Sequence, residues 1–514
     1  MTSVVLFAVC FGLIVYKAYK YMFFKPPNFP PGPPRLPFIG AYLFLLIINY
    51  KHLQFAVDKL CKFYKTNVLG LYLGPFLTVV ANDSASIKET TLNEKLDGRP
   101  DVLLSQVRDP NLVSRGITFT QGFHWRDERR FTLRHLRDFG FGRRFSELEL
   151  ELEEELRQLI EIIKNGPKYA HEREMFKDGM VLCPNVFFTM ASNSFLKVLC
   201  NERVPRENHD ELLRVIKHTD QCMKDADSYG KMFSLMPWIA KIFPNQSDYN
   251  KIKEATTAQY EFMKKLIDEQ YESYDENHVR HFLDVYFKEM KATQRSRNYQ
   301  HADFHYDQLI LTCLDFFNPA TISTTMVLTL YLRELLLNPQ IKEKIQVEID
   351  QVVGRSRLPA LDDRSKMHYT EASIREILRY QTLAPNGVPR VALESTQLSQ
   401  YDIPKGCTIF TGLRSGHLDS SRWEDSNQFA PERFLDSEGK LDLSKDHSLP
   451  FGGGKRLCAG ETHGRNLLFL VIGAILQNFD ISVPDVSKLP RETDFHTGVI
   501  TFVPEYFIKF DARR

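Results

Sequence analysis

The segment that decides the fold is Phe451-Gly452-Gly453-Gly454-Lys455-Arg456-Leu457-Cys458-Ala459-Gly460. Its glycines allow a sharp turn that brings backbone N–H groups toward a sulfur. Residues 467–476 are apolar on nearly all sides, which predicts a buried helix shortly after the turn. Cys458 therefore lies near a helix N-terminus and beside two cations, a setting that favours a thiolate. We expect Cys458 to bind a metal and the other cysteines to be small buried hydrophobic residues.

Two other kinds of site are disfavoured by the residues around Cys458. A phosphate-binding loop needs Ser or Thr after the lysine and a strand before the glycines, but Arg456 follows Lys455 and Pro450 precedes the segment. A zinc site needs further Cys or His residues at ligand spacing, and none accompanies Cys458. A single axial thiolate is typical of haem iron.

The segment resembles the haem-binding loop of cytochrome P-450 enzymes, F-x-x-G-x-R-x-C-x-G, at every fixed position. Two shorter motifs precede it in the family's order: Glu376-Ile377-Leu378-Arg379 resembles E-x-x-R, and Pro431-Glu432-Arg433-Phe434 resembles P-E-R-F. The resemblance implies a mainly α fold with minor β-sheets, haem b (iron protoporphyrin IX) ligated through Cys458, and a buried triad of Glu376, Arg379 and Arg433. Two guanidiniums and one carboxylate tolerate burial only as a hydrogen-bonded network.

Further matches extend the resemblance over most of the chain. Trp125 and Arg129 fit the family's W-x-x-x-R, and residues four apart share one helix face. The resemblance implies that Trp125, Arg129 and Arg456 bind the haem propionates and that Phe451 belongs to the haem-binding loop. Asp97-Gly98-Arg99-Pro100 and the stretch 338–359 are similar to the animal microsomal branch, insects included.

A chain of 514 residues suggests about three domains by length alone. The motifs from 125 to 458 instead require one continuous fold around one haem. We expect a membrane anchor at 1–25, a Pro-rich hinge at 26–40 and a catalytic domain at 41–514. Helical patterns dominate 145–385, including an amphipathic helix over 147–163, and β-like runs occur at 66–82 and 388–412.

The N-terminus carries an apolar run, 4–16, followed by Lys17, Lys20 and Lys25. A signal anchor, a cleaved secretory signal and an interfacial helix are all open interpretations. Positive charge after the run favours the anchor and places the catalytic domain in the cytosol. We therefore expect the protein to be held in the endoplasmic reticulum membrane by this one N-terminal segment. The prolines of 26–37 predict a stiff, extended spacer, with a ligand for SH3-type domains as the alternative.

Charge and hydropathy limit the kinds of partner that the chain can have. Lys plus Arg is 66 and Asp plus Glu is 65, so overall charge does not favour nucleic-acid binding, and a mean hydropathy of −0.30 excludes a polytopic membrane protein. Basic residues are nevertheless dense from 129 to 144, which predicts a docking face for an acidic partner. The resemblance implies NADPH–cytochrome P-450 reductase as that partner, with cytochrome b5 as a second. The basic residues are Arg129, Arg130, Arg134, Arg137, Arg143 and Arg144.

The oxygen-handling helix departs from the family pattern. The family's A/G-G-x-D/E-T-T is replaced by Pro319-Ala320-Thr321-Ile322-Ser323-Thr324. Proline inside a helix removes a backbone hydrogen bond and predicts a kink. The Ser323 hydroxyl can orient a water and relay a proton, with Thr324 beside it, whereas Ile322 cannot.

Three functions are therefore weighed. The first is a monooxygenase that inserts one oxygen atom of O2 into a small lipophilic substrate: a steroid, fatty acid, terpenoid or xenobiotic. The second, suggested by Ile322, is a non-oxygenase isomerase or dehydratase that acts on a peroxide. The third is a haem-binding protein without turnover. Ser323, the basic face and the apolar N-terminal run favour the monooxygenase.

Overall fold

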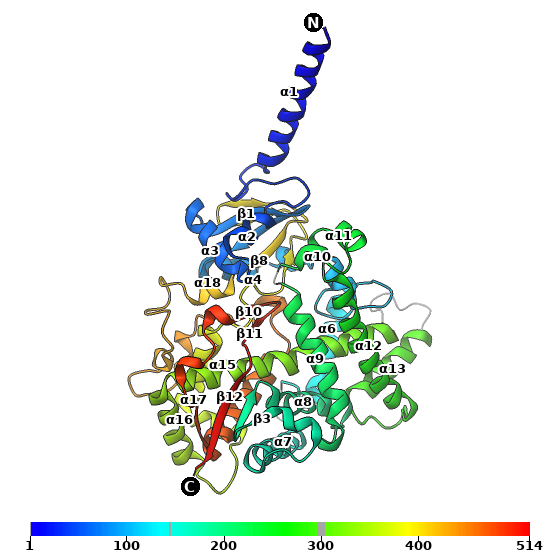
Figure 1. The fold of residues 1–514 in the computed structure, drawn as a ribbon. Coiled ribbons are helices and arrows are strands. Elements are labelled where there is room, and N and C mark those ends of the chain that lie inside the picture. The colour runs from blue at the N-terminus through cyan, green and yellow to red at the C-terminus, as the bar shows by residue number, and fades with distance from the viewer. Residues whose placement is uncertain (1, 143–144, 228, 296–303, 514) are drawn as a thin grey trace.

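The structure is a computed structural model that describes residues 2–142, 145–227, 229–295 and 304–513. Helix α1 (Thr2–Phe23) extends away from the body of the molecule (Figure 1). Next to its base lie α2 (Tyr42–Asn49), α3 (Leu53–Tyr64) and a small sheet, while helices make up most of the remainder. The expected mainly α architecture with minor sheets is confirmed.

Helices that surround the centre of the body bury one continuous apolar core. The amphipathic pattern at 147–163 is α7 (Ser146–Asn165), whose leucines at 148, 152, 156 and 159 are all buried, as predicted. The other large helices are α6 (Gly122–Asp138), α8 (Phe188–Cys200), α9 (His209–Asp225), α12 (Tyr249–Glu272), α13 (Phe282–Arg295), α16 (Pro339–Val352), α17 (His368–Tyr380) and α19 (Glu461–Asn478).

The main sheet has the strand order β1-β2-β8-β5, in which β2 and β8 run parallel. Its strands come from both predicted β-like runs, 66–82 and 388–412. A second sheet, β3-β4-β12-β9, was not predicted because its strands are short or lie at the chain's end. The bounds are β1 (Val68–Leu73), β2 (Phe76–Ala81), β3 (Phe176–Lys177), β4 (Met180–Cys183), β5 (Arg390–Val391), β8 (Thr408–Thr411), β9 (Phe479–Ser482) and β12 (Tyr506–Ala512).

One long helical stretch, Tyr306–Leu337, crosses the core. Among the described residues it is the stretch whose length and hydropathy would suit a membrane, but it is mostly buried inside the protein. It consists of α14 (Tyr306–Asn318), a π-helical turn (Pro319–Ser323) and α15 (Thr324–Leu337). The widened turn begins at Pro319, where the kink was predicted, because proline has no N–H to continue the α-helical ladder.

The predicted charged triad is confirmed. Arg379 donates two hydrogen bonds to the Glu376 carboxylate at 2.7 and 2.8 Å, and Arg433 Nε donates to Glu376 Oε1 at 3.0 Å. The remaining Arg379 donors reach the carbonyls of His417, Ser426 and Gln428. The network fixes α17 to the segment around P-E-R-F (Pro431–Phe434), a contact that the sequence separates by more than fifty residues.

Candidate active site

The Cys458 loop is shaped by its glycines and by the helix that follows. The Cys458 N–H donates to the Phe451 carbonyl at 2.9 Å, which closes the turn just before α19. Gly454 has φ +67°, and a Cβ there would lie 2.1 Å from the Thr91 carbonyl oxygen at the end of α4 (Ser84–Leu92). Only glycine allows this approach, so the loop is pressed against α4.

Cys458 is exposed, yet the chain surrounds it closely enough that burial raises the pKa of its thiol. Both observations agree if the sulfur faces a space inside the body rather than bulk water. The backbone N–H groups of Gly460 and Glu461 and the Arg129 guanidinium lower the same pKa, as predicted for a helix N-terminus. Burial has the larger effect, so the pKa of the free thiol lies above its usual value. A metal cation supplies what is missing, because coordination deprotonates a thiol.

Beside the loop lies a group of four arginines, here called the arginine cluster: Arg99, Arg390 and Arg456, which are buried, and Arg129, which is half-buried. Its carboxylate is Asp97, which forms an ion pair with Arg390 and whose backbone carbonyl accepts from Arg456 Nε at 2.8 Å. The other donors mainly reach backbone carbonyls: Arg99 reaches Thr118 and Pro389, at 2.8 Å each, and Arg129 reaches Leu457. Only Arg390 pairs with the Asp97 carboxylate, so the four guanidiniums outnumber the carboxylate that neutralises them.

The excess of positive charge in the arginine cluster is reflected in the pKa values of its guanidiniums. Burial lowers the pKa of Arg99 well below its usual value, and the neighbouring Arg456 and Arg390 lower it further. Burial also lowers the pKa of Arg456 to about 9, and lowers those of Arg129 and Arg390. Buried cations without counter-charge are costly, so the cluster is suited to an anionic ligand.

Trp125 adds an unused donor to the same place. It lies on α6, four residues before Arg129, and the Arg456 guanidinium stacks on its ring at 3.6 Å from the centroid. Its indole Nε1 is buried and has no hydrogen-bond partner among the residues that the structure describes. Buried donors are rarely left unpaired in native proteins, so this one also indicates a ligand. Phe451 is half-buried and its ring lies under the Arg465 guanidinium, 4.9 Å from the centroid.

The irregular turn of the central helix is partly exposed, although the rest of the helix is mostly buried. Pro319 is exposed and Ser323 is half-buried, although the helix crosses the core. Ile322 and Thr324 are buried, and Thr321 on the buried side shares a hydrogen bond with Ser192 at 3.0 Å. Of the two predicted hydroxyl groups, Ser323 is therefore the more accessible, and Ile322 points into the apolar core.

These features fit haem. Cys458 offers an exposed sulfur to iron, and the arginine cluster with Trp125 offers cations and a free N–H to two propionates. Comparisons with known proteins decide the matter: the family model described as Cytochrome P450 matches residues 30–510. The chain belongs to the cytochrome P450 family.

Relatives support this assignment along almost the whole length. Cytochrome P450 2B4 of Oryctolagus cuniculus is 34% identical over 94% of each chain, and cytochrome P450 2B19 of Mus musculus is 32% identical over 99% of each. Probable cytochrome P450 305a1 of Drosophila melanogaster is 30% identical over 93% of each. As a member of this family, the protein is a haem-binding monooxygenase of the animal microsomal type.

Sequence reasoning missed Arg99 and Arg390 in this P450. Arg99 belongs to the recognised Asp97–Pro100 motif, whose position in the site the sequence did not show. Arg390 lies within the predicted β-like run at 388–412 and meets Asp97 across 293 positions of sequence, so no local pattern connects them. Of the predicted basic face, Arg130, Arg134 and Arg137 are exposed on α6, whereas Arg143 and Arg144 lie outside the described residues.

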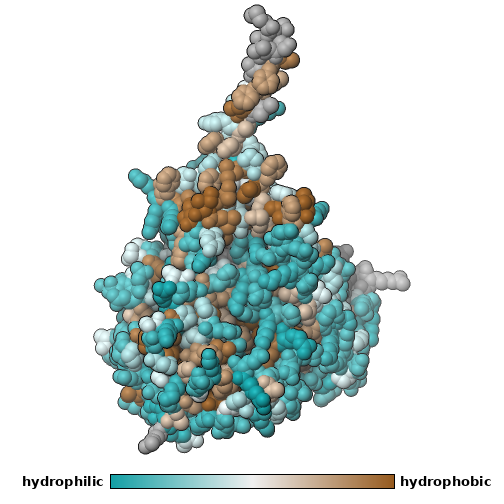
Figure 2. Space-filling view, viewed as in Figure 1, coloured by the Kyte–Doolittle hydropathy of each residue, from teal (hydrophilic) through white to brown (hydrophobic). Residues whose placement is uncertain are grey.

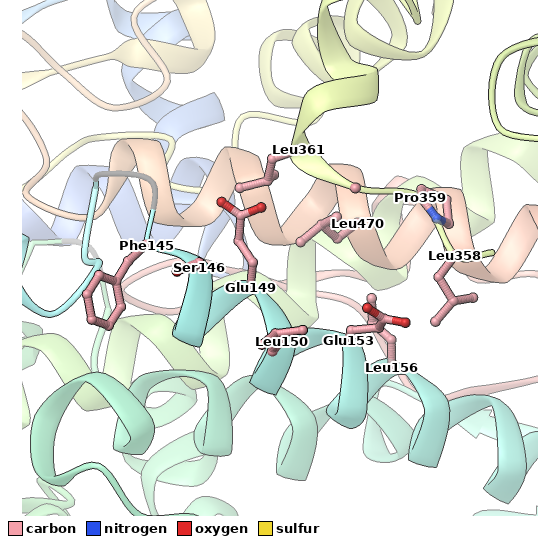
Figure 3. Close-up of a pocket in the computed structure, with 11 residues that line it drawn as sticks. Phe145, Ser146, Glu149, Leu150, Glu153, Leu156, Leu358, Pro359, Leu361 and Leu470 are labelled. Atoms are coloured by element: carbon pink, nitrogen blue, oxygen red, sulfur yellow. The ribbon is translucent and has the colours of Figure 1, made fainter.

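A separate hollow of about 530 Å³ lies between α7 and the loop at 358–361, with Leu470 of α19 in its wall (Figure 3). Leucine side chains line it, and the carboxylates of Glu149 and Glu153 extend into it from α7. Its described lining contains no cysteine, histidine or cation. It therefore lacks the groups that the Cys458 site offers to a haem.

Proposed function

We propose that this P450 is a membrane-anchored monooxygenase that receives electrons from NADPH through a flavoprotein reductase and oxidises a small lipophilic substrate. The observation that carries the proposal is the exposed Cys458 before α19, next to the arginine cluster and the unpaired Trp125 N–H. Cys458 is the iron ligand, and Trp125, Arg129 and Arg456, together with Arg99 and Arg390, bind the propionates. Phe451 shapes the ligand loop because its backbone carbonyl accepts a hydrogen bond from the Cys458 N–H.

The haem, when bound, supplies the redox chemistry of oxygen activation. The chain supplies position and protons. Ser323 is the accessible hydroxyl on the irregular turn and can hold a water or pass a proton from its Oγ. Thr324, which is buried, supports the helix at this point. The apolar side chains of the central helix, including Phe316 and Phe317, favour a lipophilic substrate such as a steroid, fatty acid, terpenoid or xenobiotic.

Electron supply is assigned to the exposed arginines of α6. Arg126, Arg130, Arg134 and Arg137 are exposed on the helix that carries Trp125 and Arg129. An acidic reductase face would therefore approach close to the haem edge, and cytochrome b5 would use the same surface. The double variant Arg134→Ala/Arg137→Ala should weaken reductase coupling and flatten its salt dependence. Unchanged coupling would contradict the assignment.

Residues 1–25 are proposed as the anchor in the endoplasmic reticulum membrane, 26–40 as the hinge and 41–514 as the cytosolic catalytic domain. The support is the apolar helix α1 with lysines after its apolar run. Asn82 and Asn245 begin N-x-S sequons. Both asparagines should stay unglycosylated in cells, because the proposed catalytic domain faces the cytosol. A glycan on either one would contradict this topology.

The deciding experiment is the ferrous–CO difference spectrum. Thiolate ligation gives a strongly red-shifted Soret band, which Cys458→Ala should abolish. Cys407→Ala is the matched control, because Cys407 is a buried cysteine far from the loop in sequence. A red-shifted band that survives in Cys458→Ala would overturn the ligand assignment.

A peroxide-specific isomerase or dehydratase is the second candidate. It is supported by Ile322, which is buried and has no exchangeable proton to relay. Turnover with NADPH and reductase should be compared with turnover on an organic hydroperoxide alone. Activity only on hydroperoxides would favour the second candidate. Intact haem without any turnover would favour a haem-binding protein.

A further inference from the structure

The place where α1 joins the body contains a cation without a counter-charge. The Arg35 guanidinium lies between the rings of Tyr21 and Tyr72, 4.2 and 4.3 Å from their centroids. Its backbone N–H donates to the Met22 carbonyl at 2.8 Å, which fixes the hinge to the end of α1. Tyr72 belongs to β1, so Arg35 connects the helix, the hinge and the sheet.

Within the described part of the chain, the Arg35 side chain has no carboxylate or carbonyl partner, and its Nε is buried and unpaired. Nearby Lys25 shows the opposite situation, because its Nζ donates to the carbonyls of Gly70 and Gly32 at 2.8 and 3.1 Å. The structure thus satisfies Lys25 internally, whereas the Arg35 guanidinium contacts two aromatic rings and forms no hydrogen bond with the described chain. Guanidinium donors match the oxygen geometry of phosphate.

Arg35 forms the polar edge of an apolar groove of about 510 Å³. The groove lies between the hinge, the β1–β2 turn and the helices α10 (Lys231–Leu235) and α11 (Pro237–Ile242). The surface around it is apolar, as Figure 2 shows below α1. The exposed hydrophobic residues there are Phe38, Ile47, Trp238, Ile242 and Phe243, and no charged residue occurs from 36 to 50.

We propose that this groove binds one phospholipid of the membrane, with its phosphate on Arg35 and an acyl chain along Leu235, Met236 and Trp238. The proposal rests on the membrane anchor proposed for α1, which places the groove at the bilayer surface. An unpaired cation beside a long apolar wall matches an amphiphile with an anionic head. Free phosphate would use only the cation, and an acidic protein segment would leave the apolar wall uncovered.

The site should prefer anionic lipids. The test uses the full-length holoenzyme in vesicles and the fluorescence of Trp238, which is 44% exposed, whereas Trp125 and Trp423 are buried. Phosphatidylserine with brominated chains should quench Trp238 with about fivefold higher apparent affinity than brominated phosphatidylcholine. Trp238→Phe should remove the quenched component.

Arg35→Gln should abolish the anionic preference while α1 keeps the protein in the membrane. Arg422→Gln, an exposed arginine on another part of the body, is the matched control and should change nothing. Flotation separates the two proposals. If the wild type does not float with vesicles, the anchor is wrong; if it floats but Arg35→Gln quenches like the wild type, the lipid site is wrong. Loss of the preference in millimolar inorganic phosphate at constant ionic strength would mean an anion site without a lipid.

Discussion

Two clusters of buried arginines lie in this P450, and they differ in how their charge is satisfied. In the triad, Arg379 and Arg433 share Glu376, and their remaining donors reach backbone carbonyls on both sides. In the arginine cluster only Arg390 pairs with the Asp97 carboxylate, and the indole N–H of Trp125 has no partner among the described residues. Arg379 and Glu376 are fully buried, whereas Arg129 of the arginine cluster donates to the carbonyl of Leu457, next to the exposed Cys458.

The difference separates a structural network from a ligand site. A buried network that satisfies its own donors needs nothing else and can only hold the fold together. A network with excess cations and an orphan donor is incomplete until an anion arrives. The haem propionates are two such anions, so the same residue type stabilises the fold in one place and binds the cofactor in the other.

The largest effect is expected from Glu376→Gln. It leaves two buried guanidiniums without their carboxylate, which should reduce the free energy of unfolding by about 3–5 kcal/mol. Urea denaturation of the holoenzyme measures this loss. Glu343→Gln, an exposed acid on α16, should change it by less than about 0.5 kcal/mol. Equal stability of Glu376→Gln and wild type would show that the triad is not the structural half of the comparison.

Arg129→Gln should affect haem retention instead of the fold. Arg129 is half-buried, and loss of a charge-assisted hydrogen bond of about 1.5–3 kcal/mol corresponds to about 10- to 100-fold faster haem loss. Transfer of haem to a high-affinity scavenger measures the rate. Arg130→Gln, the exposed neighbour on α6, should match the wild type. Unchanged haem loss in Arg129→Gln would remove Arg129 from the propionate site.

Asp97→Asn should make the cation excess larger. Arg390 loses its ion pair, so unfolding should become easier by about 1–3 kcal/mol. Removal of a buried negative charge near the haem should also move its reduction potential to a more positive value, because the reduced iron carries less positive charge. Spectroelectrochemistry measures the potential, with the exposed Asp101→Asn as control. A more negative potential would contradict the placement of Asp97 beside the haem.

The sequence predicted the structural cluster more completely than the ligand cluster. Glu376 and Arg379 lie one helical turn apart and Arg433 lies in a short motif, so local patterns contained all three. The Trp125–Arg129 spacing likewise placed two groups on one face of α6. Arg390 and Arg456 meet Asp97 only through the sheet and the Cys458 loop, and these contacts are tertiary ones that no spacing reveals.

The electrostatics of Cys458 show a second limit of sequence reasoning. Neighbouring cations and a helix N-terminus are visible in the sequence, and both lower the thiol pKa as expected. The desolvation that outweighs them depends on how deeply the loop is enclosed by α4 and α19, which the sequence does not contain. The kink at Pro319 was predictable because proline acts on its own backbone, but the burial of Ile322 was not.

Trp125→Phe gives the smallest and most specific test of the comparison. It keeps the ring under Arg456 and removes one N–H, which has no partner within the described chain. If that donor serves only the haem, the holoenzyme should lose haem about three- to tenfold faster, equivalent to about 0.5–1.5 kcal/mol. Its unfolding after haem removal should not become easier, because no internal hydrogen bond is lost. Trp423→Phe is the control. The Nε1 of Trp423 is also buried and has no partner within the described chain, but this ring lies beside the triad, where the Arg379 guanidinium stacks on it at 5.2 Å from the centroid. Haem loss that is equal in both variants would mean that an orphan indole donor does not mark the ligand cluster.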